Sequence, residues 1–128
     1  MASARILYLD DEEPLVFIVK RMLERLGHQV AGFTTANAAL AAFNAEPGAF
    51  HLVLSDMAMP GMNGIDFATA VLKVRPDAKV VIVSGYMDPR DMERAKACGV
   101  HECIRKPNTL DEMRDMIATL LPPEQIVS

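Results

Sequence analysis

The chain has 128 residues, of which 51% are hydrophobic, and a formal net charge of −4 at pH 7. This length suits one domain with a full core and no second folded module, so we expect a single domain over residues 1–128, with its core at about 5–121 and no output domain. No basic run or stripe is present, which argues against nucleic acid or an anionic membrane as partner. The longest apolar stretches are too short for a membrane span or a signal peptide, so we expect a cytoplasmic protein.

The two cysteines, Cys98 and Cys103, are separated by Gly99 and lack a CxxC or Cys/His ligand spacing. We interpret them as reduced structural thiols. Neither a zinc site nor a disulfide is predicted.

Short apolar runs alternate with amphipathic stretches five times, which predicts a parallel sheet covered by helices on both faces. The first strand is expected at residues 6–9. A helix follows, with Pro14 in its first turn and Gly27 just beyond its end. Its apolar residues share helical spacing and predict one buried face: Leu15, Ile18, Val19, Met22, Leu23 and Leu26.

The second strand is expected at residues 29–33, followed by an Ala-rich helix at about 36–45. Ala side chains bury little area, so this helix should be held mainly through Leu40 and Phe43. The third apolar run, residues 52–54, leads to a single carboxylate, Asp56, and then to a loop rich in Pro and Gly. Asp56 is therefore predicted at the carboxyl end of a buried strand.

Three more helices and two more strands complete the pattern. Asn63 and Thr109 are expected to cap the third and fifth helices, the latter as a capping box with Glu112. Residues 80–83 form the clearest strand, and a brief last strand is expected at about 102–104. The helix between Asp88 and Gly99 has few apolar residues, so we expect it to be the most mobile.

Charged and polar residues follow four of the five strands. They are Asp10 and Asp11 after the first, Asp56 at the third, Ser84 after the fourth and Lys106 after the fifth. In a parallel sheet all these ends lie on one edge, where ligands collect. Three carboxylates this close repel one another, and a divalent cation with hard oxygen ligands removes the repulsion; Mg²⁺ suits a site that leaves positions to water and phosphate. Any one of these residues alone could be structural, but their convergence on one edge indicates a site.

With these motifs the sequence resembles the receiver domain of two-component response regulators of the chemotaxis-regulator type. The matching pieces are YLDDEEP, LVLSDMAMPGMNG, VIVSGY and IRKP, and the resemblance runs from Arg5 to about Leu121. It implies the flavodoxin-like doubly wound fold, with five parallel strands in the order 2-1-3-4-5 and five helices.

The resemblance also implies a metal site and a reaction. Asp11, Asp56 and the backbone carbonyl of Ala58 would ligate Mg²⁺, with Asp10 acting through water, and the peptide bond before Pro107 would be cis. Asp56 would accept a phosphoryl group from a partner histidine kinase or phosphotransfer protein. The chain would thus be a signalling phosphoacceptor that catalyses only its own phosphorylation and dephosphorylation.

Lys106 would neutralise charge on the phosphoryl oxygens, and the Ser84 hydroxyl would donate to one of them. Movement of Ser84 would then change the surface formed by the fourth helix, fifth strand and fifth helix.

The same sequence features bear on three other functions. An FMN-binding flavodoxin shares the topology, but its first loop must cradle a phosphate, which the acidic run after the first strand would repel. A metal-dependent hydrolase would need a substrate pocket signature, and none is seen. A degenerate receiver acting as a phosphate-independent interaction module remains open, as does the choice between a stand-alone protein and a receiver belonging to a hybrid kinase.

One position departs from the family pattern. Receivers usually carry Tyr or Phe three residues before the lysine, and here that residue is Cys103, which cannot fill the space left by a moving Ser84. Two interpretations stay open. Either Tyr86 carries the signal to the fourth helix, or the chain has little conformational output and is a pure phosphate shuttle.

Overall fold

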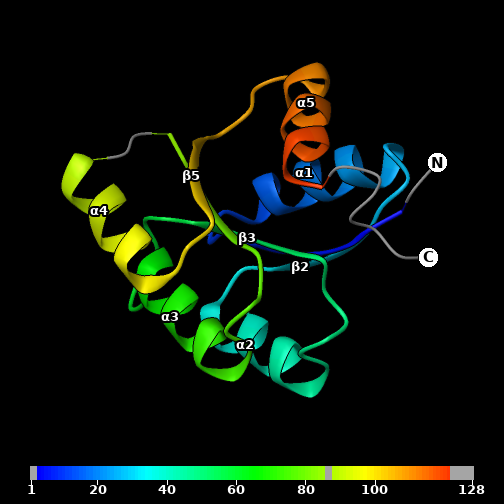
Figure 1. Ribbon diagram of the computed structural model, residues 1–128. Coiled ribbons are helices and arrows are strands. Elements are labelled where there is room, and N and C mark those ends of the chain that lie inside the picture. Colours follow the sequence, from blue (N-terminus) through cyan, green and yellow to red (C-terminus); the bar gives the residue numbers. More distant parts are fainter. Residues whose placement is uncertain (1–2, 86–87, 122–128) are drawn as a thin grey trace.

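The computed structural model describes residues 3–85 and 88–121, in which strands and helices alternate (Figure 1). The strands are β1 (Arg5–Leu9), β2 (Gln29–Phe33), β3 (Leu52–Asp56), β4 (Val80–Ser84) and β5 (Glu102–Arg105). The helices are α1 (Glu13–Arg25), α2 (Ala36–Ala45), α3 (Gly64–Val74), α4 (Pro89–Cys98) and α5 (Leu110–Leu120). Each element forms within about two residues of its predicted position.

All five strands are parallel and lie in the order β2-β1-β3-β4-β5. The predicted flavodoxin-like topology is therefore confirmed. Its consequence for the site is that β3 pairs directly with β1, with Leu9 opposite Ser55. The residues that follow β1 and the last residue of β3 must then lie next to each other.

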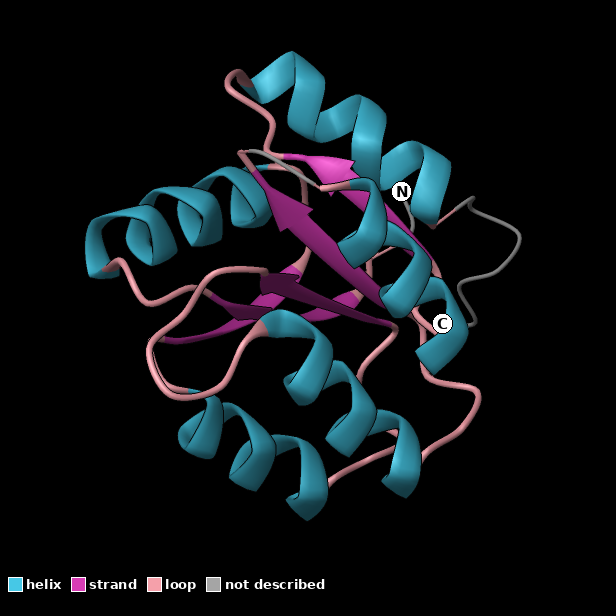
Figure 2. Cartoon of the chain, turned by 90° about the vertical axis from the view of Figure 1, so that its left-hand side faces the viewer, coloured by secondary structure: helices cyan, strands magenta, loops and turns pink. Residues whose placement is uncertain are grey.

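Two apolar cores lie on the two faces of the sheet, with α1 and α5 on one side and α2, α3 and α4 on the other (Figures 1 and 2). Alternate residues of each strand face opposite cores, as the pleat requires. In β1, Leu7 and Leu9 pack with the α2, α3 and α4 side, whereas Ile6 and Tyr8 pack with the α1 and α5 side. β3 and β4 are buried along their whole length, which agrees with their continuous apolar sequences.

The predicted helix caps form. Asn63 accepts a hydrogen bond from the Asp66 N–H at 2.9 Å, and Thr109 accepts one from the Glu112 N–H at 3.1 Å. The capping box at Thr109 is modified, because the Glu112 carboxylate accepts from the N–H of Asn108 instead of that of Thr109.

Several buried faces differ from the predicted ones. In α1 the buried residues are Leu23, as predicted, and Val16, which the predicted face did not include, while Ile18 is 50% exposed. In α2, Ala39 and Phe43 are buried and Leu40 is only partly so, because the small Ala39 lets the helix approach the sheet at that point.

Helix α4 has little apolar contact with the rest of the domain. Its only buried residue is Ala95; Met92 is 43% exposed, and Cys98 is exposed. The interpretation of Cys98 as a structural thiol is therefore wrong, since it lies on the solvent side of the helix.

The peptide bond before Pro107 was expected to be cis, but this prediction is wrong, since residues 3–85 and 88–121 contain no cis peptide bond.

Among residues 3–85 and 88–121, no helix has both the length and the apolar character that crossing a bilayer requires.

Gly64 fixes the start of α3 against the strand end that carries Asp56. Its N–H donates to the carbonyl of Met57 at 2.8 Å, and a Cβ added to it would lie 2.5 Å from the backbone oxygen of Asp56. No L-side chain fits there without displacing the backbone after β3.

Gly64→Ala should therefore lower the free energy of unfolding by about 1–3 kcal/mol, as overpacking against backbone does. Chemical denaturation measures this change. Gly48→Ala is the matched control, because an added Cβ at Gly48 meets nothing within 4 Å. Equal stabilities of the two variants would contradict the close contact.

Candidate functional site

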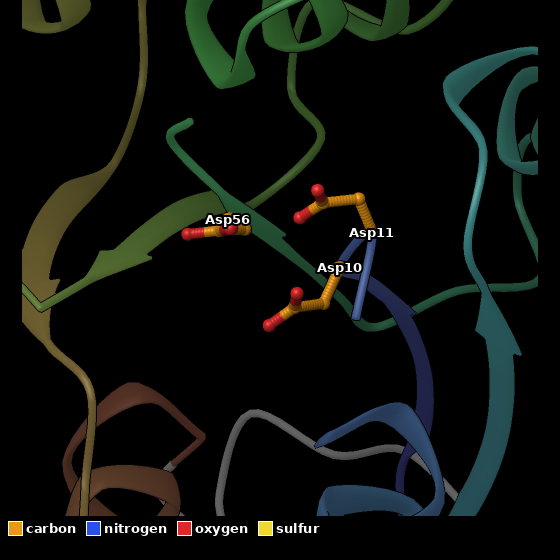
Figure 3. Close-up of side chains that lie close together, drawn as sticks. All are labelled: Asp10, Asp11 and Asp56. Atoms are coloured by element: carbon orange, nitrogen blue, oxygen red, sulfur yellow. The ribbon is translucent and has the colours of Figure 1, made fainter. Parts of the chain in front are cut away.

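Three carboxylates meet where β1 and β3 end. Each of Asp10, Asp11 and Asp56 offers an oxygen atom such that these atoms all lie within 4.8 Å of one another. Figure 3 shows Asp10 and Asp11 leaving the end of β1 beside Asp56. Asp10 and Asp56 are buried, whereas Asp11 is exposed. The arrangement predicted from the strand ends is present, and such a group of oxygens can hold a metal ion.

Asp10 is fully buried and accepts three hydrogen bonds. Its Oδ1 accepts from the N–H of Glu12 at 3.0 Å, and its Oδ2 accepts from the Tyr8 hydroxyl and from Lys106 Nζ, each at 2.9 Å. A buried carboxylate stays ionised only with such partners. Both oxygens of Asp10 are therefore engaged by the protein.

Asp56 has fewer partners. Its Oδ1 accepts a hydrogen bond from the N–H of Met57 at 2.9 Å and lies 3.4 Å from Lys106 Nζ. Only 7% of the residue is exposed. The negative charge of buried Asp56 is therefore balanced by fewer and more distant donors than that of Asp10.

Lys106 links the fifth strand to both buried carboxylates. Its N–H donates to the carbonyl of Ser84 at 2.9 Å, which extends the β4–β5 pairing beyond the last residue of β5. The ammonium group then reaches Asp10 and Asp56. One positive charge is shared between two negative ones.

The pKa shifts follow from this geometry. Burial raises the pKa of the Asp56 carboxyl; Lys106 opposes the rise and Asp10 adds to it, and the net pKa lies above the ordinary value. Burial lowers the pKa of Lys106, but the hydrogen bond and charge of Asp10 and the charge of Asp56 outweigh it, so the net pKa is raised. Lys106 therefore remains an ammonium group while the cluster stays short of positive charge.

The other predicted residues lie around this cluster. Ser84 is buried at the end of β4, and Ala58 is exposed in the loop after β3. Cys103 is partly buried in β5, and burial raises the pKa of its thiol. It borders a groove of about 420 Å³ between α4 and β5 together with Met92 and Val100. Tyr86, the proposed carrier of the signal, lies outside the described residues.

An open groove of about 580 Å³ adjoins the carboxylates. Residues from the loops after β1, β2 and β3 and from the first turn of α2 line it: Asp11, Thr34, Thr35, Ala36, Asn37, Met59, Pro60, Gly61 and Met62. Since Asp11 belongs to both groove and cluster, the acidic edge is accessible from this side.

The sequence interpretation missed Tyr8. Its hydroxyl contacts Asp10, yet the residue was treated only as part of a strand. The period of two along β1 could have identified it, because Tyr8 and Asp10 are two residues apart and so lie on the same face of the sheet.

Comparison with known proteins agrees with the geometry. Residues 6–118 match the family described as "Response regulator receiver domain". The DNA-binding transcriptional regulator NtrC of Azospirillum brasilense is 31% identical over 121 residues, which cover 94% of this chain but 25% of NtrC. The chain thus spans about a quarter of the length of that relative.

Solved structures show the same fold. A response regulator receiver domain protein from Clostridium thermocellum superposes with a TM-score of 0.85 at 28% identity, covering 95% of this chain and 97% of that one. TrrA of Thermotoga maritima, solved in complex with Mg(2+)-BeF, has a TM-score of 0.80 at 28% identity, covering 92% and 99%. Receiver domains are signalling phosphoacceptors and not conventional enzymes. The chain belongs to the response regulator receiver domains, the phosphoacceptor modules that histidine kinases partner in two-component signalling.

Proposed function

We propose that Asp56 is the residue that accepts the phosphoryl group. Its carboxylate oxygen attacks the phosphorus of a phosphohistidine in line, the P–N bond breaks, the imidazole leaves and an acyl phosphate forms. The observation that carries this proposal is the unequal compensation of the two buried carboxylates. Asp10 has three donors, whereas Asp56 has one backbone N–H and a more distant ammonium, so Asp56 retains oxygen lone pairs for attack.

Lys106 and Ser84 would act on the phosphoryl group once it is bound. The Lys106 ammonium lies between both carboxylates and can neutralise charge on a transferred oxygen. Ser84, buried at the end of the neighbouring strand, can donate its hydroxyl to another oxygen. Positioning and electrostatics are the whole contribution of these residues.

We infer that the metal is Mg²⁺, held by Asp11, Asp56 and the carbonyl of Ala58, with Asp10 acting through water. Three carboxylates and one ammonium leave excess negative charge, which fits a divalent cation with oxygen ligands. Because both Asp10 oxygens already accept protein hydrogen bonds, an indirect role suits Asp10. When bound, the ion would supply charge neutralisation for phosphoryl transfer.

The phosphodonor would be a histidine kinase or a phosphotransfer protein in the cytoplasm, and the output surface would be formed by α4, β5 and α5. The thin packing of α4 supports a surface that can shift at low cost. The alternative of a pure phosphate shuttle is favoured by Cys103, which leaves an open groove where family members carry an aromatic ring.

The direct test is incubation of the purified protein with a small acyl phosphate and Mg²⁺, followed by intact-mass spectrometry. We expect uptake of a single phosphoryl group, which requires Mg²⁺ and is absent in Asp56→Asn. Asp66→Asn is the control, since Asp66 lies in the first turn of α3 outside the cluster. Uptake that persists in Asp56→Asn would contradict Asp56 as acceptor, and no uptake by the wild type would favour a degenerate receiver.

The raised pKa of Asp56 also predicts a pH-dependent stability. An Asp whose folded pKa exceeds its unfolded value favours folding when protonated, and this contribution is lost as pH rises from the unfolded pKa through the folded one. In metal-free protein, Asp56→Asn should therefore have a higher melting temperature than wild type at pH 7.5, and the difference should shrink towards pH 4.

Asp115→Asn is the matched control for this measurement, because Asp115 is exposed on α5. This variant also removes one negative charge, but from an exposed carboxylate that pays no desolvation cost in the folded state. A lower melting temperature of Asp56→Asn than of wild type at pH 7.5 would contradict an electrostatically disfavoured Asp56.

A further inference from the structure

A buried tyrosine, Tyr8, contacts the cluster of Asp10, Asp11 and Asp56 from the core and has no part in the reaction described above. Tyr8 is 2% exposed, and its ring packs in the apolar core between the sheet and helices α1 and α5. Packing alone would be served equally by Phe, which has the same ring. The hydroxyl therefore needs its own explanation, and its partner is Asp10 Oδ2 at 2.9 Å.

That oxygen is also the partner of Lys106. The Tyr8 hydroxyl and the Lys106 ammonium both donate to Asp10 Oδ2 at 2.9 Å, while Lys106 Nζ lies 3.4 Å from Asp56 Oδ1. Two donors on one oxygen share its lone pairs and its charge, so each is held less strongly than it would be alone. Tyr8 is the donor in its pair with Asp10, because an ionised carboxylate oxygen can only accept.

We propose that Tyr8 is a positioning residue for phosphoryl transfer, whose hydroxyl shares Asp10 Oδ2 with Lys106 and so keeps the ammonium available to Asp56. This proposal rests on the function proposed above, in which Lys106 neutralises the phosphoryl oxygens. It adds that Tyr8, which does not touch the phosphoryl group, sets the position of Lys106 through Asp10.

No other side chain described around this position can replace the hydroxyl. A small cavity beneath the cluster is bordered by Tyr8 and Lys106, and its remaining lining is apolar: Leu15, Val19, Leu54, Val83, Pro107, Met113 and Met116. Loss of the hydroxyl would therefore leave Lys106 as the only donor to Asp10 Oδ2.

Two opposite effects follow for Tyr8→Phe. Lys106 would move towards Asp10 and away from Asp56, which slows phosphorylation. Asp56, with the ammonium farther away, would present more uncompensated negative charge, which strengthens the attraction of a cation. A substitution that merely damaged the fold would weaken both activities together.

The test compares wild type, Tyr8→Phe and Thr69→Val. Thr69→Val is the matched control, because it removes a partly buried hydroxyl that donates to the carbonyl of Ile65 on α3, outside the cluster. The readouts are the phosphorylation rate constant at saturating small acyl phosphate and Mg²⁺, and the Mg²⁺ Kd by calorimetry. For Tyr8→Phe we expect the rate constant to fall and the Mg²⁺ affinity to rise, each at least about threefold, as loss of one hydrogen bond implies.

A third readout does not depend on phosphorylation. The ¹⁵Nζ resonance of Lys106 in metal-free protein should shift in Tyr8→Phe and stay unchanged in Thr69→Val. An unchanged Lys106 resonance in Tyr8→Phe, or a joint fall of rate and Mg²⁺ affinity, would overturn the proposal. A wild type that takes up no phosphoryl group would instead contradict the proposed function, and the Lys106 resonance alone would then decide whether the Tyr8 hydroxyl sets the position of Lys106.

Discussion

The ion pairs of Lys106 with Asp10 and Asp56 are the interaction on which the functional edge of this domain depends. Two buried carboxylates cannot both remain ionised without a compensating charge, because desolvation penalises each of them. Lys106 supplies one positive charge for both, at 2.9 Å and 3.4 Å. The compensation is incomplete, as the raised pKa of Asp56 indicates. The same shortage of positive charge that disfavours the ionised state of Asp56 would favour binding of a cation.

The fold produces this interaction through strand order. β3 lies between β1 and β4, so Asp56 is flanked on one side by the acidic pair after β1 and on the other by the end of β4. Lys106 reaches the cluster from β5, the edge strand, by the length of its side chain. Gly64 holds the backbone after Asp56 in close contact with α3, which fixes the carboxyl end of β3. The carboxylates are therefore placed at the ends of buried strands, whereas α4 has a single buried residue, Ala95.

Much of this arrangement could be predicted from the sequence, because apolar periodicity locates strands and the residue after a parallel strand must lie at one edge. Asp10, Asp11, Asp56 and Lys106 were brought together on that basis, and the structure agrees. The failures concern properties that periodicity does not encode. The helical spacing of α1 includes Ile18, but which flank of the stripe meets the sheet depends on the tilt of the helix, and Val16 is buried instead. The period of two along β1 places Tyr8 and Asp10 on one face, but it does not tell whether the hydroxyl reaches the carboxylate, as it does here at 2.9 Å.

The most direct measurement of the central claim is an NMR titration of the Asp56 side-chain carboxyl carbon in metal-free protein, for wild type and Lys106→Met. Methionine keeps the unbranched apolar stem and removes the charge. If Lys106 compensates Asp56 incompletely, the pKa of Asp56 lies above its ordinary value in wild type and rises further in Lys106→Met. An Asp56 that titrates at the ordinary value of an exposed aspartate in both proteins would contradict the account.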